Sequence, residues 1–213
     1  ARARVAQARE ASMDFADFGT RFHDGAEEVM ASYQATGSVG SVRDQPKSDV
    51  APFVDAFEQW VHENVREVYW FEKCLVHPLH RWAGRVDAFI NHKEHGDILV
   101  DYKTRKLRQL KSGKYSCSGT RYEKDCEQLA AYSYIVPDQR TRVMNLYIHR
   151  EEPAEPVEYL WSEEDQEHWL RSFELAAWRW TLKHKYEPEN WKEEEEDGDT
   201  ENEIEANPVG AGE

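Results

Sequence analysis

Long apolar runs are missing from this sequence, which nowhere approaches the roughly 20 consecutive apolar residues of a membrane-spanning helix. The first residues, Ala-Arg-Ala-Arg-Val-Ala-Gln, also lack the apolar stretch of a secretory signal. We therefore expect a soluble cytoplasmic protein with no membrane partner. Because the chain begins without Met, it can be a fragment with a truncated N-terminus.

Cysteine is scarce as well, with Cys74, Cys117 and Cys126 at no paired spacing. An odd number of such cysteines argues against a disulfide framework and indicates a reducing compartment. Pairs of histidines three apart begin at His77 and at His92, but neither has a partner pair at zinc-finger spacing. We expect these histidines to lie on the surface.

Acidic residues outnumber basic ones by 42 to 27, and the excess is concentrated at one end. Residues 187–213 hold 12 acidic side chains and one lysine, so the body, 1–186, is close to neutral. The composition of this acidic tail predicts disorder. Three interpretations of it stay open: a solubilising end, a mimic of DNA that competes for a basic surface, or a docking segment for a partner protein.

The body is predicted to be one domain that mixes helices with strands. Helices are indicated by apolar residues three and four apart, and strands by short runs rich in β-branched and aromatic residues. The expected helices are 18–33, 49–66, 123–135 and 162–186, and the expected strands are 68–76, 84–91, 97–104, 142–149 and 157–161. This order predicts the α/β class, with a mixed central β-sheet flanked by helices.

Two neighbouring strands carry a group of charged side chains. Asp101 and Lys103 are two apart in a strand and therefore point to the same face. Asp87 lies on the preceding strand, and the polar link 92–96 predicts a hairpin that can bring it beside Asp101. An isolated Asp-x-Lys triplet is most often an ordinary exposed hairpin, so its context has to decide.

Two partly buried carboxylates repel each other, and a hard divalent cation such as Mg²⁺ is the usual remedy. A cation held in this way can polarise a phosphodiester oxygen and lower the pKa of a bound water. A lysine alongside can orient or deprotonate that water and offset developing negative charge. The pattern therefore predicts the hydrolysis of phosphodiester bonds.

Four motifs in this order resemble the RecB-like exonuclease branch of the PD-(D/E)XK nuclease superfamily. They are a helical histidine at His23, then Gly84-Arg85-Val86-Asp87, Asp101-Tyr102-Lys103 and Gln128-Leu129-Ala130-Ala131-Tyr132. Each motif alone is weak, but four in the correct order over residues 18–136 are specific. The resemblance implies a restriction-endonuclease-like core, in a bacterium or a phage-infected cell.

The resemblance also implies a set of metal ligands. Asp87 and Asp101 would bind Mg²⁺ or Mn²⁺, with the backbone carbonyl of Tyr102 completing the shell. His23 would be an accessory ligand or an orienting group, and the alternative is a helix histidine paired with a neighbouring carboxylate. Glu72, on the strand before Gly84, is a further carboxylate whose reach strand alternation leaves open.

The remaining catalytic roles follow from the same resemblance. Lys103 would act on the attacking water. Gln128 and Tyr132 are four apart and share one helix face, so they would reach the site or the DNA strand together. Three cysteines do not favour the four-cysteine iron–sulfur cluster that some relatives carry.

Residues 104–122 contain six basic residues and no acidic one. The six are Arg105, Lys106, Arg108, Lys111, Lys114 and Arg121. The phosphate backbone of DNA is the simplest partner for such a segment, and Tyr115 and Tyr122 within it can stack on unpaired bases. The alternative is a solvated loop whose charges balance the acidic tail.

We therefore expect a metal-dependent DNA exonuclease of recombination, repair or replication that acts on linear ends, single-stranded or duplex. One alternative is a structure-specific or site-specific endonuclease on the same fold. Another is a catalytically silent DNA-binding subunit, and no residue distinguishes DNA from RNA as the substrate.

Overall fold

The computed structural model describes residues 2–37, 49–77, 82–136 and 141–185, with side chains from residue 14 onward. Its helices are α1 (Arg2–Thr36), α2 (Ala51–Asn64), α3 (Glu123–Ile135) and α4 (Glu163–His184). Its strands are β1 (Val65–Val76), β2 (Ala83–His92), β3 (Gly96–Arg105), β4 (Arg108–Gln109), β5 (Tyr115–Ser116), β6 (Arg142–His149) and β7 (Val157–Leu160). Every expected helix and strand is present, while the predicted disorder of 187–213 lies outside the described residues.

Five of the strands form one mixed sheet in the order β1-β2-β3-β6-β7. β1, β2 and β3 are an antiparallel meander, β3 pairs with β6 in parallel, and β6 pairs with β7 antiparallel. The parallel pair needs a crossover connection, and α3 lies within it. The predicted α/β class with a mixed central sheet is confirmed, and β3 is its central strand.

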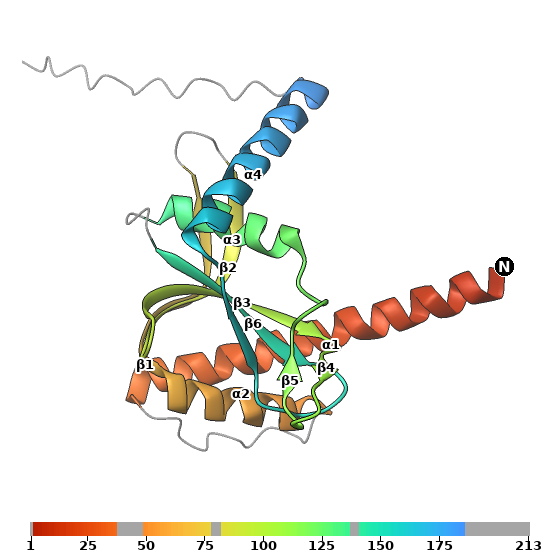
Figure 1. Cartoon of the computed structure of the whole chain (residues 1–213), viewed down its shortest axis with the longest axis vertical. Helices are drawn as coiled ribbons and strands as arrows, with labels where there is room; N and C mark the ends of the chain where they lie inside the picture. The colour runs from red at the N-terminus through yellow and green to blue at the C-terminus, as the bar shows by residue number, and fades with distance from the viewer. Residues whose placement is uncertain (1, 38–48, 78–81, 137–140, 186–213) are drawn as a thin grey trace, which may run out of the picture.

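Helices cover both faces of the sheet, which gives the domain three layers (Figure 1). On one face, α1 and α2 bring Phe22 and Phe57 together beside Tyr102 of β3. On the other face, Leu129 of α3 belongs to a second apolar cluster, and α4 packs on α3. Because side chains alternate along a strand, the aspartate and the lysine on either side of Tyr102 point to the α3 face.

Two features were not expected from the sequence. α1 begins at Arg2, whereas apolar spacing predicted a helix only from residue 18. Its first turns hold few large apolar residues, so the pattern that marks a buried helix face is missing there, and Figure 1 shows this part of α1 extending beyond the sheet. The basic segment contains a short hairpin of β4 with β5.

Among the described helices, none is long and apolar enough to cross a membrane.

Candidate active site

Asp87 lies where β2 and β3 separate. The backbone pairing of these strands runs as far as Ala88 and Val100. One residue further, the Oδ2 atom of Asp87 accepts the backbone N–H of Tyr102 at 2.6 Å, so the carboxylate replaces a backbone acceptor. Burial raises the pKa of Asp87 well above its ordinary value, and the negative charge of Asp101 raises it further.

Glu72 on β1 is the carboxylate whose reach the sequence left open, and it lies beside Asp87. The paired residues on either side of it place Glu72 opposite Asp87. Its φ of 46° is in the left-handed region, which costs a non-glycine residue roughly 1–3 kcal/mol and is concentrated at functional sites. The Nδ1 atom of His23 on α1 is 3.7 Å from a carboxylate oxygen of each residue.

The ligand atoms of His23, Glu72 and Asp87 all lie within 4.8 Å of one another. Ligand atoms that surround an ion at about 2.1 Å are about 3 Å apart, so each 3.7 Å contact of His23 would shorten by about 0.7 Å around a cation, and the two carboxylates, at most 4.8 Å apart, by about 2 Å or less. Two carboxylates suit Mg²⁺ and Mn²⁺, and the imidazole shifts the balance toward Mn²⁺. The three residues therefore fit a divalent cation, and we call them the metal triad.

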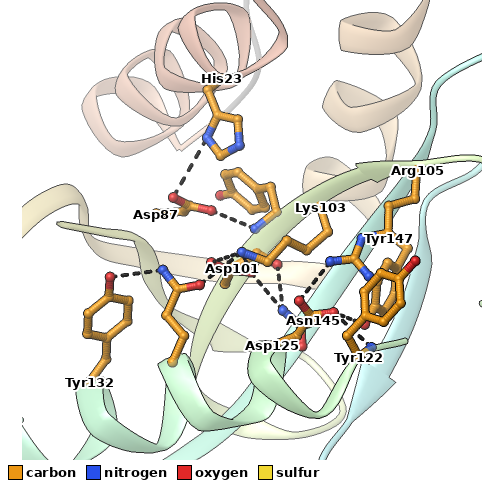
Figure 2. A network of polar contacts seen from close by, with 12 residues as sticks. His23, Asp87, Asp101, Lys103, Arg105, Tyr122, Asp125, Tyr132, Asn145 and Tyr147 are labelled. Atoms are coloured by element: carbon orange, nitrogen blue, oxygen red, sulfur yellow. Dashed lines mark hydrogen bonds and ion pairs between the residues drawn. The ribbon is translucent and has the colours of Figure 1, made fainter. Parts of the chain in front are cut away.

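Asp101 and Lys103 form a largely buried ion pair on the α3 face of β3. The ammonium group of Lys103 is 2.9 Å from one oxygen of Asp101 and 2.8 Å from the other. It also donates to Oε1 of Gln128 at 3.1 Å, and Nε2 of Gln128 donates to the hydroxyl of Tyr132 at 3.0 Å. Figure 2 shows the motif residues near one another in two sets of contacts, His23 with Asp87 and the N–H of Tyr102, and Asp101 with Lys103, Gln128 and Tyr132.

The pKa values of both members of the ion pair are shifted from their ordinary values. Burial raises the pKa of Asp101, although Lys103 acts in the opposite direction. Burial lowers the pKa of Lys103, but the charge and hydrogen bond of Asp101 outweigh it and leave that pKa raised. The ammonium form of Lys103 is therefore favoured.

Asp101 is held by three contacts and is not one of the metal triad. Two come from Lys103, and Nδ2 of Asn145 donates to Oδ2 at 2.7 Å. A carboxylate has about four lone-pair directions, so one direction of Asp101 remains for a cation. That Asp101 and the carbonyl of Tyr102 also bind the ion stays a prediction.

Asn145 and Trp161 support the site and were missed by the sequence analysis. Asn145 lies on β6 and is fully buried, and its Oδ1 accepts the indole N–H of Trp161 at 2.7 Å. The signal was present, because an asparagine interrupts the otherwise apolar run from Val143 to Ile148 and buried polar residues need partners.

Gly84 explains why the strand motif begins with glycine. A Cβ atom at this position would lie 2.2 Å from Cε1 and 2.6 Å from the hydroxyl oxygen of Tyr132. Real Cβ contacts are not this short, so only glycine leaves space for the tyrosine ring. The second and the fourth of the four motifs are therefore linked by direct packing of β2 against α3.

Arg105 makes structural contacts within the domain, and the phosphate contact that the sequence predicted for it stays a prediction. Its guanidinium pairs with the buried Asp125 at 2.7 Å and donates to the backbone oxygen of Thr120. The ring of Tyr122 covers it at 4.3 Å, and only 17% of its side chain is exposed. These contacts use its donors to hold α3 against the sheet, as Figure 2 shows.

The other basic residues lie mostly at the surface. Lys106, Arg108, Lys111 and Lys114 are exposed. Tyr115 is half-buried with its ring 4.5 Å from that of His149, and the guanidinium of Arg121 lies 3.8 Å above the ring of Tyr159. Their binding to nucleic acid stays a prediction.

His77 and His92 are both buried, so the expectation of surface histidines is wrong at these two positions. The contacts of His92 show why. Its Nε2 is 3.3 Å from a carboxylate oxygen of Glu158, which also accepts the indole N–H of Trp60. Burial lowers the pKa of His92. His92 is the last residue of β2 and packs against α2. The local spacing of the sequence does not reveal this contact between two elements.

A surface hollow of about 480 Å³ opens onto the metal triad. Its described lining comes from α1, β1, β2 and the end of β3, and includes Phe15, Thr20, His23, Asp24, Glu27, Glu72, Arg85 and Asp87. The triad is therefore accessible from solvent rather than sealed in the core.

Comparisons with known proteins support the fold. No protein-family model matches this chain, and a search of curated proteins finds no relative. Among solved structures, it is similar to the crystal structure of a candidate exonuclease from Eubacterium rectale, with a TM-score of 0.52 and 12% sequence identity. The match covers 82% of this chain and 69% of that protein. At this identity the likeness shows a shared fold.

Proposed function

We propose that this protein is a metal-dependent deoxyribonuclease of the RecB-like branch of the PD-(D/E)XK superfamily. The observation that carries the proposal is the metal triad, three ligand atoms within 4.8 Å, whose Asp87 also accepts the N–H of Tyr102, the residue between Asp101 and Lys103 on the central strand. The fold shared with a candidate exonuclease agrees with it. Exonuclease action on DNA ends, in recombination, repair or replication, rests on the motifs alone.

The chain's own residues divide the work of hydrolysis. A divalent ion bound here supplies Lewis acidity toward the scissile phosphate and a more acidic bound water. His23, Glu72 and Asp87 would hold that ion. Lys103 is near enough to Asp87 for its charge to lower the pKa of that carboxyl, and its ammonium group would orient the attacking water and offset charge that develops on the phosphate.

The contacts around Lys103 fix its position. Gln128 accepts one of its protons, and Tyr132 holds Gln128 in turn. Asp101 holds Lys103 from the other side. A lysine side chain has many rotamers, so a lysine held by Asp101 and Gln128 loses less entropy when the substrate arrives.

Metal binding is tested first by thermal unfolding with and without Mn²⁺. At a concentration 100 times its Kd, a ligand stabilises a protein by about 2.7 kcal/mol. A chain of this size then melts about 5–11 °C higher. Glu72→Gln and Asp87→Asn should each remove most of this shift, because an amide is a poor ligand for a hard cation. If neither Mn²⁺ nor Mg²⁺ changes the melting temperature of the wild-type protein, the proposal is wrong.

Catalysis is tested with end-labelled linear DNA in the presence of Mn²⁺ or Mg²⁺. Wild type should release labelled product, and Asp101→Asn and Lys103→Gln should not, although both should still bind DNA. Covalently closed circular DNA separates the two enzymatic alternatives, since only an endonuclease cuts it. A protein that binds metal and DNA but cuts neither DNA nor RNA would instead be the silent subunit.

A further inference from the structure

Arg85 lies at the metal triad and has no role in the reaction proposed above. Its Nε atom is 2.5 Å from Oε2 of Glu72, and one of its terminal nitrogens is 3.8 Å from Oε2 of Glu27. The other oxygen of Glu72, Oε1, faces His23. Arg85 therefore holds Glu72 from behind and leaves its triad-facing oxygen in place.

The guanidinium of Arg85 is only partly used by these contacts. It has five N–H donors in a fixed plane, and the described residues engage it closely only through Nε. The contact with Glu27 is longer than a hydrogen bond. The Arg85 side chain is 57% exposed, against 11% for Glu72, so its outer edge faces solvent at the rim of the hollow.

The charge of the hollow makes this outer edge important. Asp24, Glu27, Glu72 and Asp87 all line it, and among its described lining residues Arg85 is the one lysine or arginine. A polyanion that enters the hollow meets four carboxylates, and a divalent ion at the triad offsets only two charges. Arg85 is the lining group that can attract a phosphate next to the one being cut.

We propose that Arg85 binds a backbone phosphate of the nucleic acid with its outer edge while its Nε stays on Glu72, an inference that rests on the proposed nuclease function. A planar guanidinium can serve two anions along two edges. A lysine carries the same charge but only one compact ammonium group. It would keep the phosphate contact only by giving up the fixed contact with Glu72.

The test measures DNA binding in a Lys103→Gln background, in which the DNA is not consumed. Fluorescence anisotropy of a labelled single-stranded oligonucleotide with Mn²⁺ gives the affinity as a function of KCl concentration. Arg85→Gln should weaken binding and reduce the slope of log K against log[salt] by about 0.7, the value for one lost phosphate contact. Arg85→Lys should keep the slope. Arg66→Gln is the matched control, because Arg66 is exposed on the same strand pair and its described contacts are with Asn91 and Lys93.

The outcomes separate this inference from a merely structural role. If Arg85 only supported Glu72, the Gln and Lys variants would alter binding alike. An unchanged slope in Arg85→Gln, with the Mn²⁺-induced melting shift retained, would overturn the phosphate contact while the proposed nuclease function stands. If Mn²⁺ did not raise the melting temperature of the wild-type protein, the proposed function itself would be wrong.

Discussion

Replacing Gly84 with alanine should displace Tyr132 and so test how the site is assembled. The added Cβ would lie 2.2 Å from the ring, whereas ordinary contact begins at 3.4 Å, so the ring has to move by about 1.2 Å. Its 3.0 Å hydrogen bond with Gln128 would break. Overpacking of this kind costs about 1–3 kcal/mol, which lowers the melting temperature by about 2–12 °C in a chain of this length.

A double-mutant cycle with Tyr132→Ala isolates the cause. Without the tyrosine ring, the atoms that would be too close to the new methyl group at position 84 are absent. Gly84 also does not have a positive φ, so alanine is not strained there. In the Tyr132→Ala background, Gly84→Ala should therefore be neutral or stabilise by about 0.4–1 kcal/mol, because it restricts the unfolded chain.

Thermal or urea unfolding of the four proteins gives the coupling free energy between the two positions. We expect it to be about 1–3 kcal/mol, since the two groups are in direct contact. Equal destabilisation by Gly84→Ala in both backgrounds would show that the backbone, and not the tyrosine, demands glycine. Our explanation of the motif would then be wrong.

Two further predictions concern the basic segment and the cysteines. Arg105→Gln should lower the free energy of unfolding by about 3–5 kcal/mol in a urea titration, because it leaves the buried Asp125 without its cation. The double variant Lys111→Gln, Lys114→Gln should instead leave stability unchanged and reduce the dependence of DNA affinity on salt concentration. A thiol reagent at mildly alkaline pH should modify the exposed Cys74 quickly and Cys126 only after unfolding, because burial raises the pKa of Cys126 to about 12. Rapid modification of a second thiol in the folded protein would contradict this prediction.

Local periodicity carried the predictions that the structure bears out. Apolar spacing located the helices and strands, since each element must bury one face. The shared face of Asp101 and Lys103 followed from strand alternation, and that of Gln128 and Tyr132 from the helical repeat. These residues are in contact in the structure because each relation lies within one element or between neighbours in the sheet.

What the sequence analysis left open or missed depends on relations between elements. Glu72 reaches the triad because of the β1–β2 register and its left-handed φ, and alternation along β1 shows neither. Arg105 belonged to a basic run, but its contact with Asp125 forms only when α3 packs on the sheet. The burial of His92 likewise requires α2 and β7.

The electrostatics of the site argue that it exists for a ligand. Carboxylates are costly to bury, and Asp87 is buried beside the negative charges of Asp101 and Glu72. The N–H of Tyr102 and the charge of Lys103 offset part of this cost, yet the pKa of Asp87 stays well above its ordinary value. A fold that needed only stability would place apolar residues here, since well-packed apolar groups usually do no worse than buried charges. The strained backbone of Glu72 adds a second cost at the same point. Costs that coincide at one accessible hollow agree with the proposed cation, which would neutralise these groups on binding.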